Sequence, residues 1–164
     1  MILKKQDKEK IISKINLIAN SALSLTTVII KGASVNTINN LRKEARENKV
    51  NIHVVRNTLL KRSLSKTSFE CIKKKITGPI LTAFSLDHPG SAVRILKKFE
   101  KNNNGIKINN AVFEGKILSM IEIDNLAVMP TYKEAISRFI FLIQEASIGK
   151  LLRVLSLLKN TKKK

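Results

Sequence analysis

The sequence predicts an α+β fold, a split βαβ (ferredoxin-like) sandwich with an N-terminal helix, followed by a long C-terminal helix. Strand-forming stretches and helical patterns follow one another as strand, helix, strand, paired short helices, strand, helix, strand. With 164 residues, of which 43% are hydrophobic, the chain can build one ordinary domain core. Beyond residue 130 a helical pattern continues almost without interruption. Together these observations favour a sandwich over a doubly wound sheet.

The N-terminal part of the chain shows two helical and two strand patterns. Residues 7–23 place isoleucines and alanines at helical spacing, which predicts an amphipathic helix. The β-branched run at residues 26–32 ends at a glycine and predicts a strand. Ser34 can cap the next helix, and the alternation at residues 50–55 predicts a second strand. The chain therefore begins as helix, strand, helix, strand.

The middle of the chain is predicted to contain two short helices before the third strand. One helix starts at Asn57. Thr67 and Glu70 have the spacing of a capping box, which predicts a second short helix that runs to Lys75. The apolar stretch at residues 78–85 predicts a third strand. Pro79 does not argue against it, because a proline is tolerated at the first residue of a strand.

The next helix is expected to have Asp87 as its cap and Pro89 in its first turn. Residues 106–115 then predict the fourth strand, and residues 122–129 predict a short helix that Pro130 stops. This proline gives the domain boundary, with domains at residues 1–130 and 131–164.

The second domain is predicted to be one helix that starts at a capping box of Thr131 and Glu134 and runs to about Leu158. It is apolar over most of its circumference, so it must be buried on several sides. Its main stripe lies on either side of Gly149: Ile136, Phe139, Ile140, Ile143, Leu151, Leu152, Leu155 and Leu158. Partner chains docking at two successive sites are the favoured interpretation. A membrane interface, a homologous helix and docking back on the first domain are the alternatives.

Composition and motifs bear on the class of function. The net charge of +19 favours a polyanionic partner such as nucleic acid, with a membrane surface as second candidate. A cytoplasmic location is expected, because the N-terminus has no secretory apolar segment. Neither His53 nor His88 has a second ligand at metal-binding spacing, and the sequence contains no phosphate-binding glycine loop. We therefore expect no catalysis, no metal and no cofactor.

Cations gather where the second strand meets the following helix. Arg56 and Asn57 stand at the strand end, and Lys61 and Arg62 follow one turn later, so they can grip RNA phosphates. Lys31, at the end of the first strand, completes the candidate RNA-binding set. Because only 4% of the residues are aromatic, contact with phosphates and RNA shape is favoured over stacking on single strands. The alternative is a solvated charged turn.

Six short motifs resemble those of a known family, in the same order and at the same spacing. They are "VVRNTLLKR" (54–62), "GP" (78–79), "HPG" (88–90), "FEG" (113–115), "MPTYKEA" (129–135) and "GKLLRVL" (149–155). The family is that of the bacterial ribosomal stalk-base proteins, the tenth protein of the large subunit. The resemblance covers essentially the whole chain. The chain departs from the family in its basic tail, "KNTKKK", and in a C-terminal helix richer in Ile and Phe.

The resemblance implies a function without catalysis. It implies a first domain bound to large-subunit rRNA at the GTPase-associated centre, beside the eleventh large-subunit ribosomal protein. It implies that the C-terminal helix carries acidic stalk protein dimers, which recruit translation factors, and that the protein can repress its own mRNA. An extraribosomal RNA-binding regulator and a peripheral membrane protein remain the alternatives.

Overall fold

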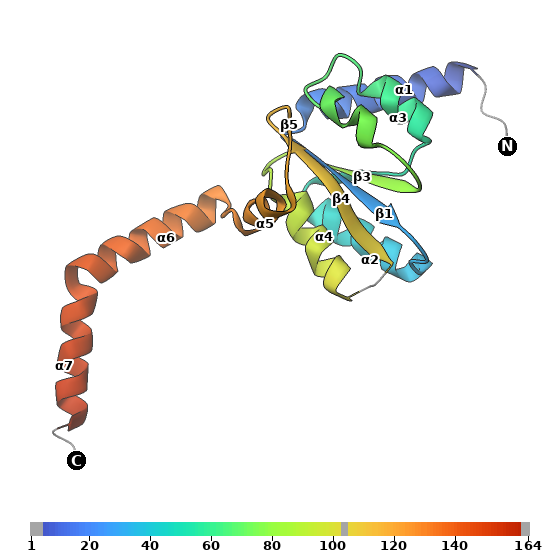
Figure 1. Cartoon of the computed structure of the whole chain (residues 1–164). Helices are drawn as coiled ribbons and strands as arrows, with labels where there is room; N and C mark the ends of the chain where they lie inside the picture. The colour runs from blue at the N-terminus through green and yellow to red at the C-terminus, as the bar shows by residue number, and fades with distance from the viewer. Residues whose placement is uncertain (1–4, 103–104, 162–164) are drawn as a thin grey trace. The chain divides into compact units, whose positions relative to one another are not determined.

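The computed structural model describes residues 5–102 and 105–161. Its five-stranded sheet has the order β2-β3-β1-β4-β5, and every neighbouring pair is antiparallel (Figure 1). The strands are β1 (Ser24–Ile30), β2 (Val50–His53), β3 (Ile80–Ser85), β4 (Ile106–Phe113) and β5 (Lys116–Ile117). The helices around the sheet are α1 (Lys5–Ser21), α2 (Val35–Glu47), α3 (Asn57–Ser63), the 3-10 helix η1 (Glu70–Lys75), α4 (Ser91–Asn102) and α5 (Met120–Val128). The predicted α+β class is confirmed.

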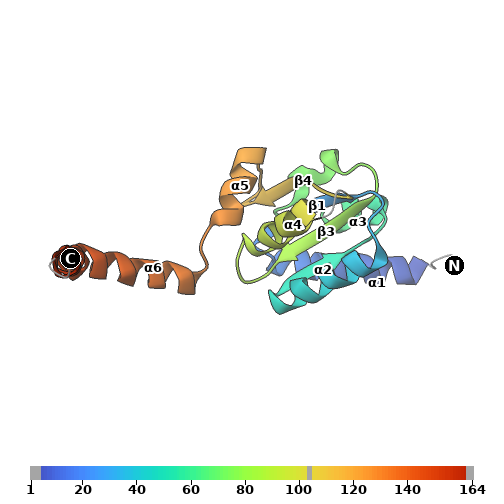
Figure 2. The ribbon, with the colours of Figure 1, turned by 90° about the horizontal axis from the view of Figure 1, so that it is seen from below.

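Helices cover both faces of the sheet, so the domain has two hydrophobic cores. One core lies under α2, α4 and α5, on the face that Figure 2 views, and includes Val28 and Leu81. The other lies under α1, α3 and η1 and includes Leu25 and Phe84. Successive strand residues point to opposite faces, so β1 and β3 must be apolar on both. This explains the nearly continuous β-branched run that marks β1 in the sequence.

The antiparallel pairing brings four strand ends together. Ile29 of β1 lies opposite Ile80 of β3, and Ile30 lies opposite Ile106 of β4. His53, the last residue of β2, lies opposite Thr82 of β3. The carboxyl ends of β1 and β2 therefore meet the amino ends of β3 and β4 at one end of the sheet.

Two predicted helix starts are wrong. Thr67 and Glu70 form no capping box, because the Thr67 hydroxyl donates to the Leu64 carbonyl instead. Lys66 is in the left-handed region with φ 66°, and η1 begins only at Glu70, after Phe69 has entered the core. Asp87 is not the cap of α4 either: α4 begins at Ser91, and the Asp87 carboxylate pairs with Lys49 at 2.7 Å.

The chain forms two compact units, Met1–Met129 and Pro130–Lys164. The second unit consists of α6 (Tyr132–Gln144), the π-helical turn η2 (Glu145–Gly149) and α7 (Lys150–Thr161). The predicted capping box of Thr131 and Glu134 is confirmed, with both reciprocal hydrogen bonds present. The expectation of one uninterrupted α-helix is wrong, because η2 separates α6 from α7 and the helix bends there (Figure 1).

Candidate nucleic-acid interface

The end of the sheet where the four strand ends meet carries three of the predicted RNA-binding residues. Lys31 directly follows β1, and its backbone N–H donates to the Gly105 carbonyl at 2.8 Å. Arg56 and Asn57 lie where the chain passes from β2 into α3. The Asn57 side-chain amide donates to the carbonyl of Gly78, just before β3, at 2.9 Å. The fold thus brings residues from separate parts of the sequence to one edge, which we call the cationic end.

Helix α3 places the other two predicted cations. Leu59 and Leu60 are buried in the core beneath α1 and fix the rotation of the helix. Lys61 lies one turn after Asn57 and is half-buried, whereas Arg62 lies one turn after Thr58 and is exposed. The buried leucines therefore hold both cations on the same short helix that Arg56 precedes.

The predicted cations at this end differ in their pairing from two lysines of α4. Within residues 5–102 and 105–161, none of Lys31, Arg56, Lys61 and Arg62 forms an ion pair with a carboxylate. On α4, by contrast, Lys97 pairs with Asp124 and Lys98 pairs with Glu44. An anion that binds at α4 must compete with these carboxylates. An anion at Lys31, Arg56, Lys61 or Arg62 meets no such paired carboxylate among the described residues.

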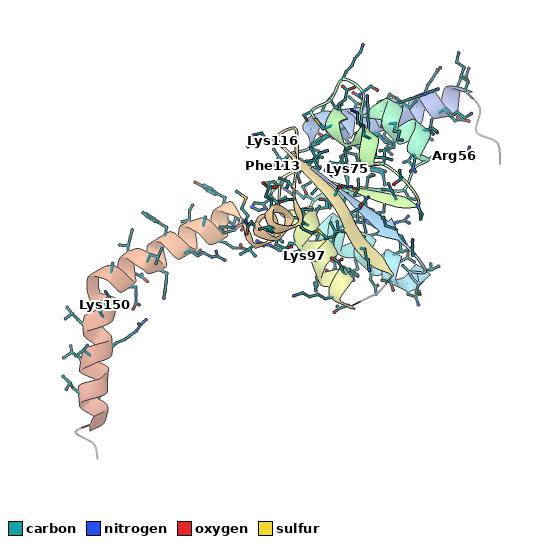
Figure 3. All side chains as sticks on the ribbon, in the orientation of Figure 1. Arg56, Lys75, Lys97, Phe113, Lys116 and Lys150 are labelled. Carbon is teal, nitrogen blue, oxygen red and sulfur yellow. The ribbon has the colours of Figure 1, made fainter. Side chains whose placement is uncertain are left out.

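Sequence reasoning missed a further cation at this end, Lys107. It lies in β4 between the buried residues Ile106 and Ile108, and its own side chain is exposed. Strand alternation turns it toward the face that carries α1 and α3. In the sequence, a lysine that alternates with two isoleucines in a predicted strand indicates an exposed cation at this position. Lys75, at the end of η1, lies on this same face, and Figure 3 shows it together with Arg56.

A groove of about 340 Å³ lies beside the cationic end, between α1, the end of β2 and the start of α3. Its lining includes Ile11, Lys14, Ile15, His53, Val54 and Arg56. Burial, and secondly the charge of Lys14, hold the pKa of His53 below its usual value of 6.5. The groove therefore combines apolar walls, a neutral imidazole and two cationic side chains.

The second unit presents a different surface. Its predicted docking residues are all exposed, from Ile136 at 41% to Leu151 at 66%. They form two groups, Ile136, Phe139, Ile140 and Ile143 on α6 and Leu151, Leu152, Leu155 and Leu158 on α7. Phe141, Leu142 and Val154 are exposed as well. The side chains of Ile148 and Leu157, two further apolar residues of this segment, lie outside the described residues.

Comparison with known proteins identifies the family. The sequence profile of the ribosomal protein L10 family matches residues 3–101. The chain belongs to this family. A large ribosomal subunit protein uL10 from Wigglesworthia glossinidia brevipalpis is 52% identical over 161 residues, covering 98% of this chain and 100% of the relative. Proteins of the same name are 50% identical in Buchnera aphidicola subsp. Cinara cedri and 43% identical in Shewanella sp. (strain W3-18-1). These matches cover 94% and 99% of this chain, and 96% and 98% of the relatives.

As an L10 family member, the chain is a ribosomal protein of the large subunit and a structural component, not an enzyme. Its place is thus in a ribonucleoprotein that carries out translation. Among the described residues, every helix is too short or too polar to span a lipid bilayer. Within the same part of the chain, no cluster of three or more His, Cys, Asp or Glu side chains could hold a metal ion.

Proposed function

We propose that this L10 family member anchors the ribosomal stalk. The first domain, residues 1–130, binds large-subunit rRNA at the GTPase-associated centre, beside the eleventh large-subunit protein. The second, residues 131–164, carries the acidic stalk protein dimers that recruit translation factors. The observation that carries the proposal is the separation of two surfaces, a cationic end in one compact unit and exposed apolar faces in the other.

The rRNA part of the proposal is supported by the cationic end. Arg56, Lys61 and Arg62 are grouped around one short helix, and none of them has a carboxylate partner within the described residues. Phosphate contacts of this kind release counterions and supply a large share of the affinity for nucleic acid. The same surface can hold an mRNA leader, which would allow the protein to repress its own synthesis.

The stalk part of the proposal is supported by the two apolar faces and by charge. Exposed isoleucines, leucines and phenylalanines on α6 and α7 form a large apolar surface, which marks an interaction site. Around it lie the exposed cations Lys133 and Lys150. These side chains suit an acidic partner whose own apolar face covers the helix.

Sedimentation with large subunits tests both parts. Subunits stripped of their L10 family protein and of stalk dimers are mixed with the full chain or with residues 1–130, and acidic stalk protein is added. Both forms should sediment through a moderate salt wash, but only the full chain should retain stalk protein. Circular dichroism of the shortened chain shows whether it is folded. If the folded full chain stays in the supernatant, an extraribosomal RNA-binding regulator becomes the better description.

A further inference from the structure

The groove beside the cationic end exposes an apolar residue among charges. Val54 lies directly after β2 and is 58% exposed, although it is flanked by the groove residues His53 and Val55. Ile11 of α1 adds a half-buried apolar side chain to the lining, whereas the lining residues Ile15 and Leu59 are buried. Water therefore contacts Val54 and part of Ile11, so a ligand with a flat apolar surface would gain from covering them.

The charges of the groove define the second property of its ligand. Lys14 and Arg56 lie on its rim, and no carboxylate is among its lining residues. Lys14 is close enough to His53 to lower the pKa of the imidazole, which places the Lys14 charge beside the groove wall. The groove therefore suits a ligand that is apolar at one end and anionic at the other.

Arg56 connects this groove with the cationic end, since it lines the groove and stands where β2 passes into α3. A polyanion that contacts Arg56 therefore also lies at the groove. RNA carries a flat base and an anionic phosphate within every single nucleotide, so one unstacked nucleotide meets both requirements. Proteins commonly recognise RNA by accommodating such splayed-out bases.

We propose that the groove between α1, β2 and α3 holds one unstacked nucleotide of the bound RNA. Its base lies against Val54 and Ile11, and its phosphate lies between Lys14 and Arg56. This inference rests on the proposed binding of rRNA and adds a base-binding subsite to it. An acidic peptide would need an apolar and an anionic side chain at matching positions, so it is the weaker candidate.

A tryptophan placed at the groove tests the proposal in the full chain. The sequence contains no tryptophan and one tyrosine, so Val54→Trp creates a single tryptophan whose emission can be excited separately from that of Tyr132. Binding of an rRNA fragment that spans the GTPase-associated centre should quench its emission, because a base stacks on the indole. The matched control is Val35→Trp at the start of α2, where the replaced valine is 72% exposed. Its emission should stay unchanged at saturating RNA.

Affinity gives a second readout. Val54→Asp should weaken binding of the fragment roughly tenfold, because the apolar wall beneath the base is interrupted and the new carboxylate repels the phosphate. Val35→Asp introduces the same charge on α2 and should change affinity far less. Unchanged affinity of Val54→Asp, together with unquenched Val54→Trp emission on bound RNA, would overturn the subsite and leave rRNA anchoring intact.

Other outcomes identify a different occupant. Quenching or a blue shift with a glutamate-rich peptide, but not with RNA, would assign the groove to an acidic protein partner. Blue-shifted emission of the free Val54→Trp protein would show that the chain itself fills the groove. Both results overturn the proposal. If the wild-type chain fails to bind the fragment at all, the proposed function fails first, and the subsite fails with it.

Discussion

The side-chain amide of Asn57 donates to the carbonyl of Gly78 at 2.9 Å, across 21 positions of sequence. This bond holds the start of α3 beside the turn that leads into β3. Asn57→Ala should therefore lower the free energy of unfolding by about 1 kcal/mol, the usual worth of one hydrogen bond. It should also weaken rRNA binding, because Arg56 and Lys61 lose their fixed position. Urea denaturation and filter binding measure the two effects.

The salt dependence distinguishes positioning by Asn57 from direct phosphate contact. Asn57→Ala removes no charge, so the slope of the logarithm of the binding constant against the logarithm of salt concentration should stay as in wild type. A shallower slope in this variant would mean that the protein binds fewer phosphates. Asn57 would then do more than position its neighbours.

Charge reversal at the cationic end should change the salt slope, unlike Asn57→Ala. Arg56→Glu with Arg62→Glu should weaken rRNA-fragment binding and lower the magnitude of the salt slope by about 2, one for each phosphate that is no longer bound. Arg42→Glu with Arg46→Glu, on the exposed side of α2, changes the net charge equally and serves as control. Equal losses in both double variants would indicate general attraction by the net charge and no specific surface.

The two groups of exposed apolar residues in the second unit should bind stalk dimers separately. Phe139→Asp with Ile143→Asp should remove the dimer on residues 134–147, because each large apolar side chain removed from a packed site costs roughly 2 to 5 kcal/mol. Leu152→Asp with Leu155→Asp should remove the dimer on residues 150–159. Native mass spectrometry of the reconstituted stalk complex counts the dimers that remain.

The control for these variants is Met120→Asp with Ile121→Asp, which replaces exposed apolar residues of α5 in the first unit. It should leave every dimer in place. Loss of all dimers from either of the first two variants would indicate one cooperative interface along both helices. Retention of all dimers by both would refute the assignment of this unit to stalk binding.

Two adjacent threonines of β1 should respond oppositely to the same substitution. The Thr26 hydroxyl is buried and has no hydrogen-bond partner among the described residues, whereas the Thr27 hydroxyl donates to the Asn110 carbonyl at 3.0 Å. Thr26→Val should raise the free energy of unfolding by about 1 kcal/mol, because it removes a buried polar group without a partner. Thr27→Val should lower it. A loss of stability in Thr26→Val would reveal a partner for that hydroxyl.

His53 should make the domain less stable in mild acid. Its pKa in the folded state lies below the usual 6.5, so the unfolded chain takes up the proton more readily. The contribution of His53 to the free energy of unfolding is therefore constant above pH 6.5 and falls as the pH decreases below this value. His53→Gln should remove this part of the slope. Identical slopes for the two proteins, measured by denaturation at several pH values, would contradict the assignment.

Local chemistry allowed the sequence to determine the α+β class, the main elements and the capping box at Thr131. Helical and strand periodicities depend on residues only a few positions apart, so they are visible in the chain itself. The grouping of Arg56, Asn57, Lys61 and Arg62 is likewise visible in the chain, because these residues are neighbours in sequence. The two-residue strand β5 was missed because two residues do not show a period.

Only the tertiary structure decided which distant residues come together. The grouping of Lys31, Lys107 and Arg56 at one end of the sheet depends on the pairing of β1 with β3 and β4 and of β2 with β3. The groove depends on how α1 packs beside α3. Phe69 enters the core and overrides the capping signal of Thr67, because burying an aromatic ring gains more free energy than a cap supplies. Such interactions are set by packing between segments far apart in the chain, and no local pattern encodes them.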